Sequence, residues 1–165
     1  MQLEDQLVSE LWARDVRFLM GDSSNAIPLL TPENLIQSLA ESTDARLRLS
    51  LIPLFLRHPE FSVNAEKSGK TLSSTTPQIV LWFYYTAALL LQRKYQERLS
   101  KIFGLQSQLP DLFSKKINVD LTENYEYSLL ELAKQHQILS GQSINWLGTY
   151  EHAANRLIQH MEKFK

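Results

Sequence analysis

Apolar residues recur every three or four positions along most of this chain, in stretches separated by runs of Ser, Thr, Asn, Gly and Pro. That period is typical of amphipathic helices, because it collects apolar side chains on one helical face. Hydroxyl or Asp residues precede several stretches, where they can cap a helix, and Gly or Pro follows others. The pattern predicts an all-α, single-domain bundle of about six to seven helices over residues 1–165.

The first predicted helix covers about residues 3–20. Its apolar positions keep helical spacing, and Gly21 follows as a residue that readily adopts the left-handed conformation found at helix ends. Residues 16–20 are also compatible with a short strand, because β-branched and aromatic residues gather there. We expect a helix that ends at Gly21, with a strand as the alternative for its last part.

Two further helices are predicted in the first third of the chain. Thr31 stands before a proline, which suits a helix cap and first turn, so a helix is expected over 32–41. Residues 42–44 offer the next cap, and an apolar run follows as far as His58, which precedes a proline. Pro53 lies within that run and should kink the helix, because proline removes one backbone hydrogen bond.

The middle of the chain predicts an exposed, flexible loop followed by the longest helix. Residues 62–76 are mostly Ser, Thr, Lys, Asn and Gly without periodicity, so deletion of 64–70 should leave the fold intact. No helix breaker occurs between Pro77 and Gly104, which predicts one helix over 77–103, about 40 Å long. The first half of this helix is apolar on every side and should form the centre of the core.

Two seams of heptad-like spacing end the chain. One covers 121–139 and stops before Gly141, and the other covers 147–164 behind a cap at Ser143. Helices with such seams and so short a connection pack against one another in opposite directions. The pattern predicts a C-terminal antiparallel helical hairpin.

The composition narrows the class of protein. The chain has 165 residues, of which 44% are hydrophobic and 21% charged, as in one ordinary globular domain. It has no cysteine, which excludes disulfides, thiolate nucleophiles and cysteine-ligated zinc or iron–sulfur sites. The acidic start is unlike a signal peptide, and the most apolar stretch, 79–91, is shorter than the about 20 residues of a membrane span. We expect a cytoplasmic protein without a membrane segment.

The net charge of −1 argues against a protein that binds nucleic acid through general phosphate contacts. The charge is unevenly spread, however, because residues 61–116 carry eight Lys and Arg against three Asp and Glu. A basic cluster within them comprises Arg93, Lys94, Arg98 and Lys101, near the end of the long helix. These four are candidate binding residues for an anionic ligand or partner, although cations also suit the C-terminal turn of a helix.

Signals for catalysis, a cofactor or a metal are absent from the sequence. None of the glycine-rich phosphate-binding, nucleophile-elbow or H-E-x-x-H motifs occurs. Of the four histidines only His152 and His160 share an element, and about 12 Å of helix separates them, too far to bind one metal. His136 lies in an apolar seam, where a histidine is usually a core residue. No cofactor and no metal are expected.

His152, Arg156 and His160 follow one another at four-residue steps on the last helix and are further candidate binding residues. This His-Arg-His stripe resembles the HEPN family, helical-bundle ribonucleases in which a histidine follows an arginine after four to six residues. The resemblance implies ribonuclease chemistry from Arg156 and His160. Here three residues separate the two, and Leu157 replaces the polar residue that usually follows the arginine. The solvated side of an amphipathic helix has the same pattern.

A second resemblance covers residues 11–21, LWARDVRFLMG, which are similar to the helix-to-strand opening of minimal nucleotidyltransferases. Those enzymes continue with a glycine-serine turn and an Asp-x-Asp or Asp-x-Glu pair that holds magnesium. Residues 21–24 resemble the turn, but no such acidic pair occurs anywhere in the chain. The sequence therefore excludes nucleotidyl transfer by that mechanism.

Two functional hypotheses remain. The leading one is a non-enzymatic helical binding or interaction module, such as the small partner in a two-protein bacterial toxin–antitoxin or defence pair. Another protein is its expected partner, nucleic acid is less favoured, and a homo-oligomer is compatible with the sequence. The alternative is an HEPN-like ribonuclease or nucleotide-handling bundle that uses Arg156 and the histidines of the last helix. Convergence of the stripe and the basic cluster in one cleft would favour the ribonuclease, and dispersal would favour the module.

Overall fold

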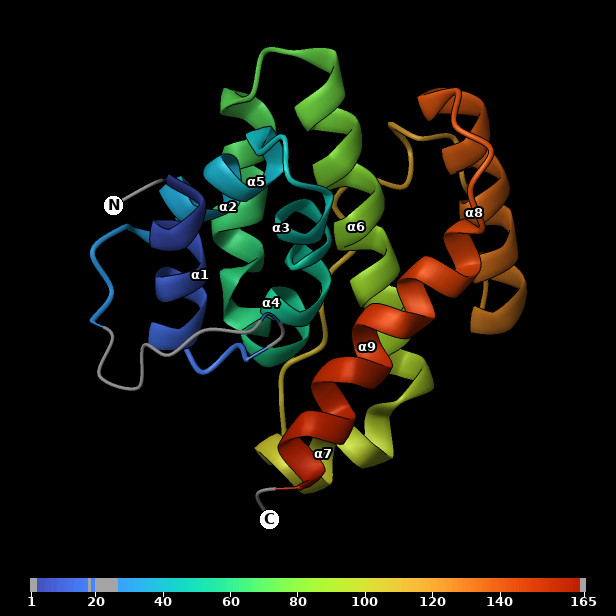
Figure 1. Cartoon of the computed structure of the whole chain (residues 1–165). Coiled ribbons are helices and arrows are strands. Elements are labelled where there is room, and N and C mark those ends of the chain that lie inside the picture. Colours follow the sequence, from blue (N-terminus) through green and yellow to red (C-terminus); the bar gives the residue numbers. More distant parts are fainter. Residues whose placement is uncertain (1–2, 18, 20–26, 164–165) are drawn as a thin grey trace.

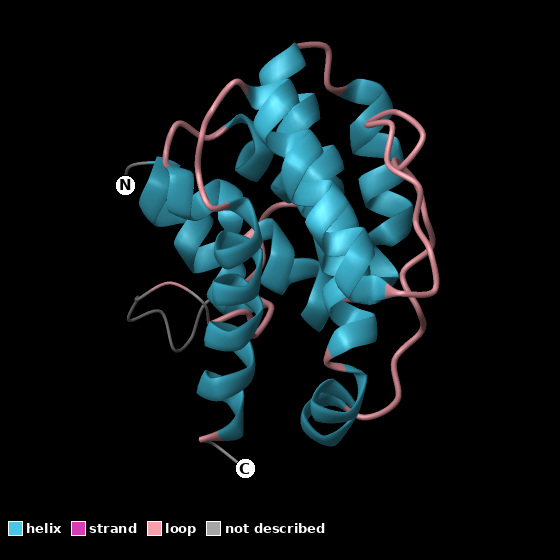
Figure 2. Ribbon diagram, turned by 90° about the vertical axis from the view of Figure 1, so that its right-hand side faces the viewer, coloured by secondary structure: helices cyan, strands magenta, loops and turns pink. Residues whose placement is uncertain are grey.

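Helices form all the regular secondary structure in the part of the chain that the computed structural model describes, residues 3–17, 19 and 27–163, and no strand occurs there (Figure 2). In chain order the elements are α1 Leu3–Ala13, α2 Pro32–Glu41, α3 Ala45–Leu49, α4 Leu51–Arg57, the 3-10 turn η1 Pro59–Phe61, α5 Ser62–Thr71, α6 Thr75–Lys94, α7 Gln96–Phe103, α8 Tyr125–Ser140 and α9 Trp146–Glu162. The predicted all-α fold is confirmed. These residues hold more helices than expected, because two predicted helices are each interrupted once and a predicted loop is helical.

Helix α6 is the central element of the bundle, as its apolar sequence predicts. It packs against α2, α4, α5, α8 and α9. In Figure 1 it lies between α2 to α5 on one side and α8 with α9 on the other. Every residue of 83–91 is buried, because a helix that is apolar on all sides must be enclosed by its neighbours.

The prediction of one helix over 77–103 was wrong, because the chain bends at Tyr95 between α6 and α7. Neither Gly nor Pro stands at the bend, which is accompanied by contacts with α9. The hydroxyl of Tyr95 donates to the carboxylate of Glu151, and Lys94 binds the same carboxylate. The bend turns α7 beneath α9 (Figure 1), where α7 ends at Gly104 as expected.

Helix α1 ends at Ala13, so the prediction of a helix to residue 20 was also wrong. Asp15 adopts the left-handed conformation with φ 62°. The N–H of Val16 donates to the carbonyl of Leu11 at 2.9 Å, and the N–H of Asp15 to that of Trp12 at 3.0 Å. These bonds form a Schellman motif in which Asp replaces the usual glycine. Gly21 and most of the segment after it lie outside the described residues.

The segment expected as a flexible loop, 62–76, is largely helical, because it contains α5 and the start of α6. That prediction was wrong because α5 packs through small residues and not through an apolar stripe. Ala65, Ser68 and Gly69 are buried, and the hydroxyl of Ser68 donates to the carbonyl of Glu33 in α2 at 3.1 Å. Small side chains allow α5 to approach its neighbours closely, so the expectation that 64–70 can be deleted no longer holds.

We expect Gly69→Leu to lower the free energy of unfolding by about 1–3 kcal/mol, the usual loss when a packed site is overfilled. A Cβ atom at position 69 would lie 2.8 Å from Cε1 of Phe113, so α5 or the ring must move. Lys67→Leu, on the exposed side of the same helix, is the control and should change stability by less than about 0.5 kcal/mol. Urea titration measures both, and equally small losses would contradict close packing of α5.

The predicted kink near Pro53 is a full interruption, with α3 and α4 meeting at Ser50. The proline ring crowds the carbonyl of the residue four positions earlier, Leu49. A new helix that begins at Leu51 places Pro53 in its first turn, where the missing N–H has no helical partner to lose. The helix then ends at His58, as predicted.

The last two helices form the predicted hairpin. Helix α8 ends at Gly141, which has φ 70°, and Asn145 caps α9 in place of the expected Ser143 by accepting from the N–H of Gly148 at 2.9 Å. The two helices run in opposite directions and diverge from their connection (Figure 1). The rings of His136 and Trp146 stack at the point of contact, with centroids 3.6 Å apart. Phe164, the last position of the predicted seam, lies outside the described residues.

Candidate functional site

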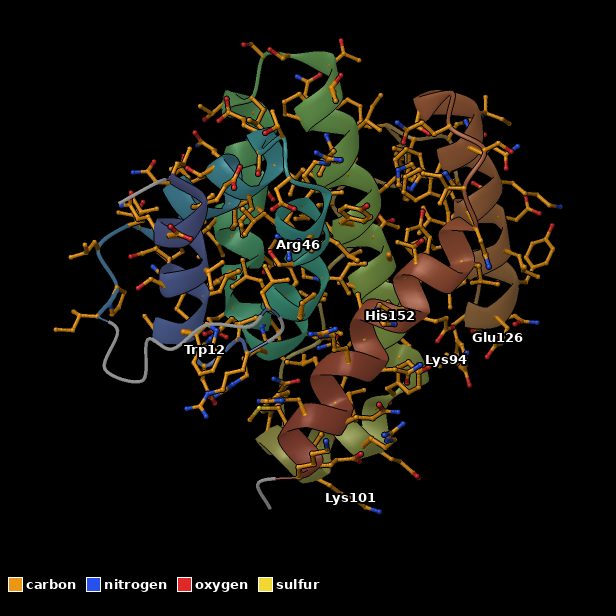
Figure 3. The ribbon with its side chains drawn as sticks, viewed as in Figure 1. Trp12, Arg46, Lys94, Lys101, Glu126 and His152 are labelled. Carbon is orange, nitrogen blue, oxygen red and sulfur yellow. The ribbon has the colours of Figure 1, made fainter. Side chains whose placement is uncertain are left out.

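Lys94 and Arg98, two members of the basic cluster, bind carboxylates of the chain itself. Nζ of Lys94 lies 2.7 Å from Oε1 of Glu151 and 3.2 Å from Oε1 of Glu126 (Figure 3). Nη2 of Arg98 lies 2.8 Å from Oε1 of Glu162. Burial by itself lowers the pKa of Lys94, but hydrogen bonds to two carboxylates outweigh it and raise this pKa above its ordinary value. These charges join α6 and α7 to α8 and α9, so they do not form an open basic patch.

The other two members of the basic cluster face different surroundings. Lys101 is exposed on α7 and interacts electrostatically with the same carboxylate as Arg98. The hydrogen bond and charge of Arg98, together with the charge of Lys101, lower the pKa of Glu162. Arg93 directly precedes Lys94 and so points about 100° away from it around α6. It is exposed and borders a small cavity of about 50 Å³. The four residues therefore do not meet in one binding site.

Two members of the His-Arg-His stripe border a cavity that no member of the basic cluster lines. His152 and Arg156 border a cavity of about 510 Å³ formed with residues of α1 and α3. Three carboxylates also line it, those of Glu4, Asp5 and Asp44. Its charges are therefore mixed, which does not suit a polyanion such as RNA.

His160, the last member of the stripe, is uncharged near neutral pH. Burial and the positive charges of Arg17, Lys163 and Arg156 lower its pKa below the ordinary value. Its neighbour two turns earlier, His152, is exposed in the middle of α9 (Figure 3). His152 follows Glu151, the partner of Lys94, so the two side chains point about 100° apart around α9. The stripe and the basic cluster do not converge in one cleft.

The outer face of α8 carries an apolar stripe that the sequence analysis did not identify. Tyr127, Leu130 and Ile138 are 52%, 48% and 70% exposed. On a helix of 3.6 residues per turn these positions lie within about 80° of one another. The buried residues Leu129 and Leu132 point to the opposite side, into the bundle. The signal was present as a second set of apolar positions at helical spacing, which makes α8 apolar on two sides. We call these three residues the outer stripe.

One ion pair accompanies the outer stripe. Nζ of Lys134 lies 3.4 Å from Oε1 of Glu131, one turn earlier on α8. Both residues fall between Tyr127 and Ile138 along the helix, on the same side of it. The outer face of α8 therefore has apolar residues toward its ends and one charge of each sign near its middle.

The described residues show neither a metal site nor a membrane-spanning helix, and comparison with known proteins gives no match. No group of three or more His, Asp or Glu side chains there is placed to hold a metal ion. None of the described helices combines the length and the hydropathy needed to cross a membrane. No protein-family model, curated protein or solved structure matches the chain.

Proposed function

We propose that the protein is a non-enzymatic helical interaction module that binds a protein partner through the outer stripe of α8. The observation that carries this proposal is the exposure of Tyr127, Leu130 and Ile138 on a helix whose opposite side is already buried. A helix that is apolar on two sides is normally covered on both. Exposed apolar residues gathered on one face mark interaction surfaces more often than single scattered ones.

The separation of the His-Arg-His stripe from the basic cluster supports this function over a ribonuclease. A nuclease would need cations and a histidine directed into one cleft, to hold phosphate and move a proton. Lys94 and Arg98 instead bind Glu151 and Glu162. Arg156 lies in a cavity that also holds carboxylates.

A second copy of the chain is the partner that fits the outer stripe, because the stripe is complementary to itself. Two copies of α8 can pair antiparallel about a two-fold axis midway between residues 132 and 133. Tyr127 then lies over the partner's Ile138, because both are equally far from that midpoint. By the same symmetry Glu131 faces the partner's Lys134, and the reciprocal pair forms on the other side of the axis. Tyr127 and Ile138 therefore meet on both sides of the axis and opposite charges meet, whereas Leu130 lies opposite the partner's Gln135.

The self-association should be weak. Three half-exposed apolar side chains on one helix bury far less than the roughly 1,200 Å² of a stable interface. Their burial must also offset the lost freedom of two molecules. We therefore expect a dissociation constant on the order of 10⁻⁴ M.

The test exchanges the two charges. Glu131→Lys and Lys134→Glu each place like charges opposite one another in the homodimer, so each variant alone should remain monomeric. An equimolar mixture restores both opposite-charge contacts and should associate again, with an affinity at least about ten times that of either variant alone. Sedimentation velocity between about 5 and 500 µM spans the expected dissociation constant.

Ile138→Glu should abolish association, because it places charge in the apolar contact. Leu105→Glu is the matched control, since Leu105 is 99% exposed but lies outside α8, and it should associate like the wild type. A wild-type protein that stays monomeric up to about 500 µM, or a mixture that associates no better than its components, contradicts the second copy as partner.

A further inference from the structure

A cavity of about 400 Å³ lies between α3, α6, α8 and the start of α9, on the inner side of α8 and away from the outer stripe. This volume falls within the range of small-molecule sites, about 300–1,000 Å³. Polar groups reach it from Arg48, Tyr84 and His136, and Trp146 forms part of its apolar wall. No Asp or Glu is among the described residues that line it. Its ionisable lining therefore contains no negative charge at neutral pH.

Tyr84 presents a hydrogen-bond donor to this cavity. The residue is only 6% exposed, yet its hydroxyl makes no hydrogen bond to any described residue. Burial raises the pKa of Tyr84 to about 12, against a smaller opposing effect of the charge of Arg48. The phenol therefore stays protonated at neutral pH. A ligand that accepts a hydrogen bond from this hydroxyl would give it a partner within the cavity.

His136 presents a second donor. Its ring is 3% exposed and stacks between Phe83, with centroids 4.2 Å apart, and Trp146, at 3.6 Å. Its Nδ1 lies 2.5 Å from the hydroxyl of Tyr150. That buried hydroxyl has no other partner among the described residues, so it satisfies its proton by donating to Nδ1. The ring proton of the neutral imidazole is then on Nε2, which has no partner there and remains available to the cavity.

The charge of His136 does not change near neutral pH, because burial lowers its pKa to about 3. The ionisable groups around it are Arg48 on α3, Tyr84 on α6 and Tyr150 on α9. Burial raises the pKa of both tyrosines. Arg48 is therefore the one ionisable group of this set that carries charge between about pH 6 and 8.

Arg48 supplies a single positive charge. Its guanidinium donates to the carbonyl of Ser42 at 2.9 Å, and it forms no ion pair with any described carboxylate. Thr75 and Thr76 are exposed where the cavity reaches the first turn of α6. That turn adds a partial positive charge, because the backbone N–H groups at the start of a 20-residue helix have no helical partner. The Ser74 side chain does not cap them.

We propose that this cavity is a binding site for a small organic monocarboxylate with an apolar body. The carboxylate accepts from the guanidinium of Arg48 and the hydroxyl of Tyr84, and the body packs against Trp146. One cation matches one negative charge, so a carboxylate fits better than a phosphate dianion, which would bring a second charge without a counterion. The further apolar wall, from Ile79, Val80 and Leu139, favours an aromatic or aliphatic ligand over a sugar.

The test uses four probes that differ in charge or shape. Benzoate and octanoate are aromatic and aliphatic monocarboxylates, benzamide is the neutral analogue of benzoate, and phenyl phosphate is a dianion. We expect the two carboxylates to bind at least about ten times more tightly than benzamide or phenyl phosphate, because only they match the single cation. Isothermal titration calorimetry measures the affinities, and quenching of tryptophan fluorescence that is lost in a Trp146→Phe variant places the ligand in this cavity.

Two variants remove the proposed contacts, and one is a control. Tyr84→Phe deletes only the unpartnered hydroxyl and should weaken carboxylate binding about tenfold or more. Arg48→Gln should do the same and should leave benzamide binding unchanged. Arg46→Gln is the matched control, because Arg46 is an exposed arginine of the same helix that does not line this cavity. Thermal melting shows whether each variant is folded, and Tyr84→Phe decides the question if Arg48→Gln is not.

The pH dependence separates this cavity from the exposed histidines. Carboxylate affinity should be constant between about pH 6 and 8, because Arg48 keeps its charge and His136 stays neutral there. Affinity that rises as the pH falls from 8 to 6 would place the ligand outside this cavity and overturn the proposal. So would equal binding of benzoate and benzamide, or no binding of either carboxylate at about 10 mM. The Ile138→Glu variant, which removes the outer stripe, should bind both carboxylates like the wild type.

Discussion

Replacing Leu89 by alanine is expected to lower the free energy of unfolding by about 2–5 kcal/mol. Leu89 is 1% exposed on α6, the helix against which α4 and α8 make their most extensive contacts. Truncation removes buried apolar surface and leaves a cavity that three helices would have to move to fill. Because each of these helices is held by the others, the site can collapse only partly, which places the loss toward the larger end of the range.

Urea titration of Leu89→Ala and of Leu105→Ala measures this effect. Leu105 is 99% exposed, so its truncation removes almost no buried surface and should change stability by less than about 0.5 kcal/mol. The midpoint should shift for Leu89→Ala with an unchanged slope, because the surface exposed on unfolding stays nearly the same. A loss below about 1 kcal/mol would show that α6 is not the centre of the core.

Replacing Glu10 by glutamine is expected to destabilise the fold by about 3–5 kcal/mol, the usual result of breaking a buried ion pair from one side. Glu10 is 1% exposed. Its carboxylate accepts from the N–H of Leu29 at 2.9 Å, from the N–H of Leu30 at 2.8 Å and from Nη1 of Arg14 at 3.0 Å. Glutamine keeps the shape but leaves the guanidinium of Arg14 without its carboxylate. The amide of glutamine also has only one acceptor oxygen, whereas both carboxylate oxygens of Glu10 accept hydrogen bonds.

Glu10 also gives the stability a defined pH dependence. Burial by itself raises the pKa of Glu10, but the hydrogen bonds from Leu29, Leu30 and Arg14 outweigh it and lower this pKa below 4.5. The folded state therefore binds the proton less readily than the unfolded state. The contribution of Glu10 is fully present above about pH 4.5 and is lost as the pH falls toward the lowered folded-state pKa. Glu10→Gln should remove this part of the acid dependence, so the stability gap between the wild type and the variant narrows below that pH.

Glu66→Gln is the control for this pair of predictions. Glu66 forms an exposed ion pair with Lys70 on α5, with Oε1 and Nζ 3.8 Å apart, and such pairs contribute less than about 1 kcal/mol. Thermal and urea unfolding at about pH 7 and pH 4 would measure all three proteins. Equal stability losses for Glu10→Gln and Glu66→Gln at pH 7, or a gap that does not narrow in acid, would contradict the role of Glu10.

Several helix boundaries followed local signals in the sequence. Thr31 and Pro32 set the start of α2, and its predicted and observed bounds agree at 32–41. Gly104 and Gly141 end α7 and α8 as expected, with φ 78° and 70°, because few other residues adopt that conformation readily. Capping and helical period involve residues within a few positions of one another, so the sequence contains them directly.

Boundaries that depend on distant residues were not predictable in this way. The bend at Tyr95 accompanies contacts with Glu151, 56 residues later. The small residues of α5 have no amphipathic pattern, and α5 is helical because Ser68 and Gly69 lie against α2 and Phe113. The spacing of apolar residues in one helix does not identify the neighbouring helix on which it packs.

The candidate sites show the same difference between local signals and long-range contacts. The sequence alone determined that the chain is helical, that the first half of the long helix forms the centre of the core, and that cations gather near the end of that helix. Only the tertiary structure decided that Lys94 is neutralised by Glu151, 57 residues away, and that Arg48, Tyr84 and His136 meet at one cavity. The pairing of a charge and the exposure of a donor to a cavity both depend on the positions of several helices at once. The spacing of apolar residues along one helix does not encode those positions.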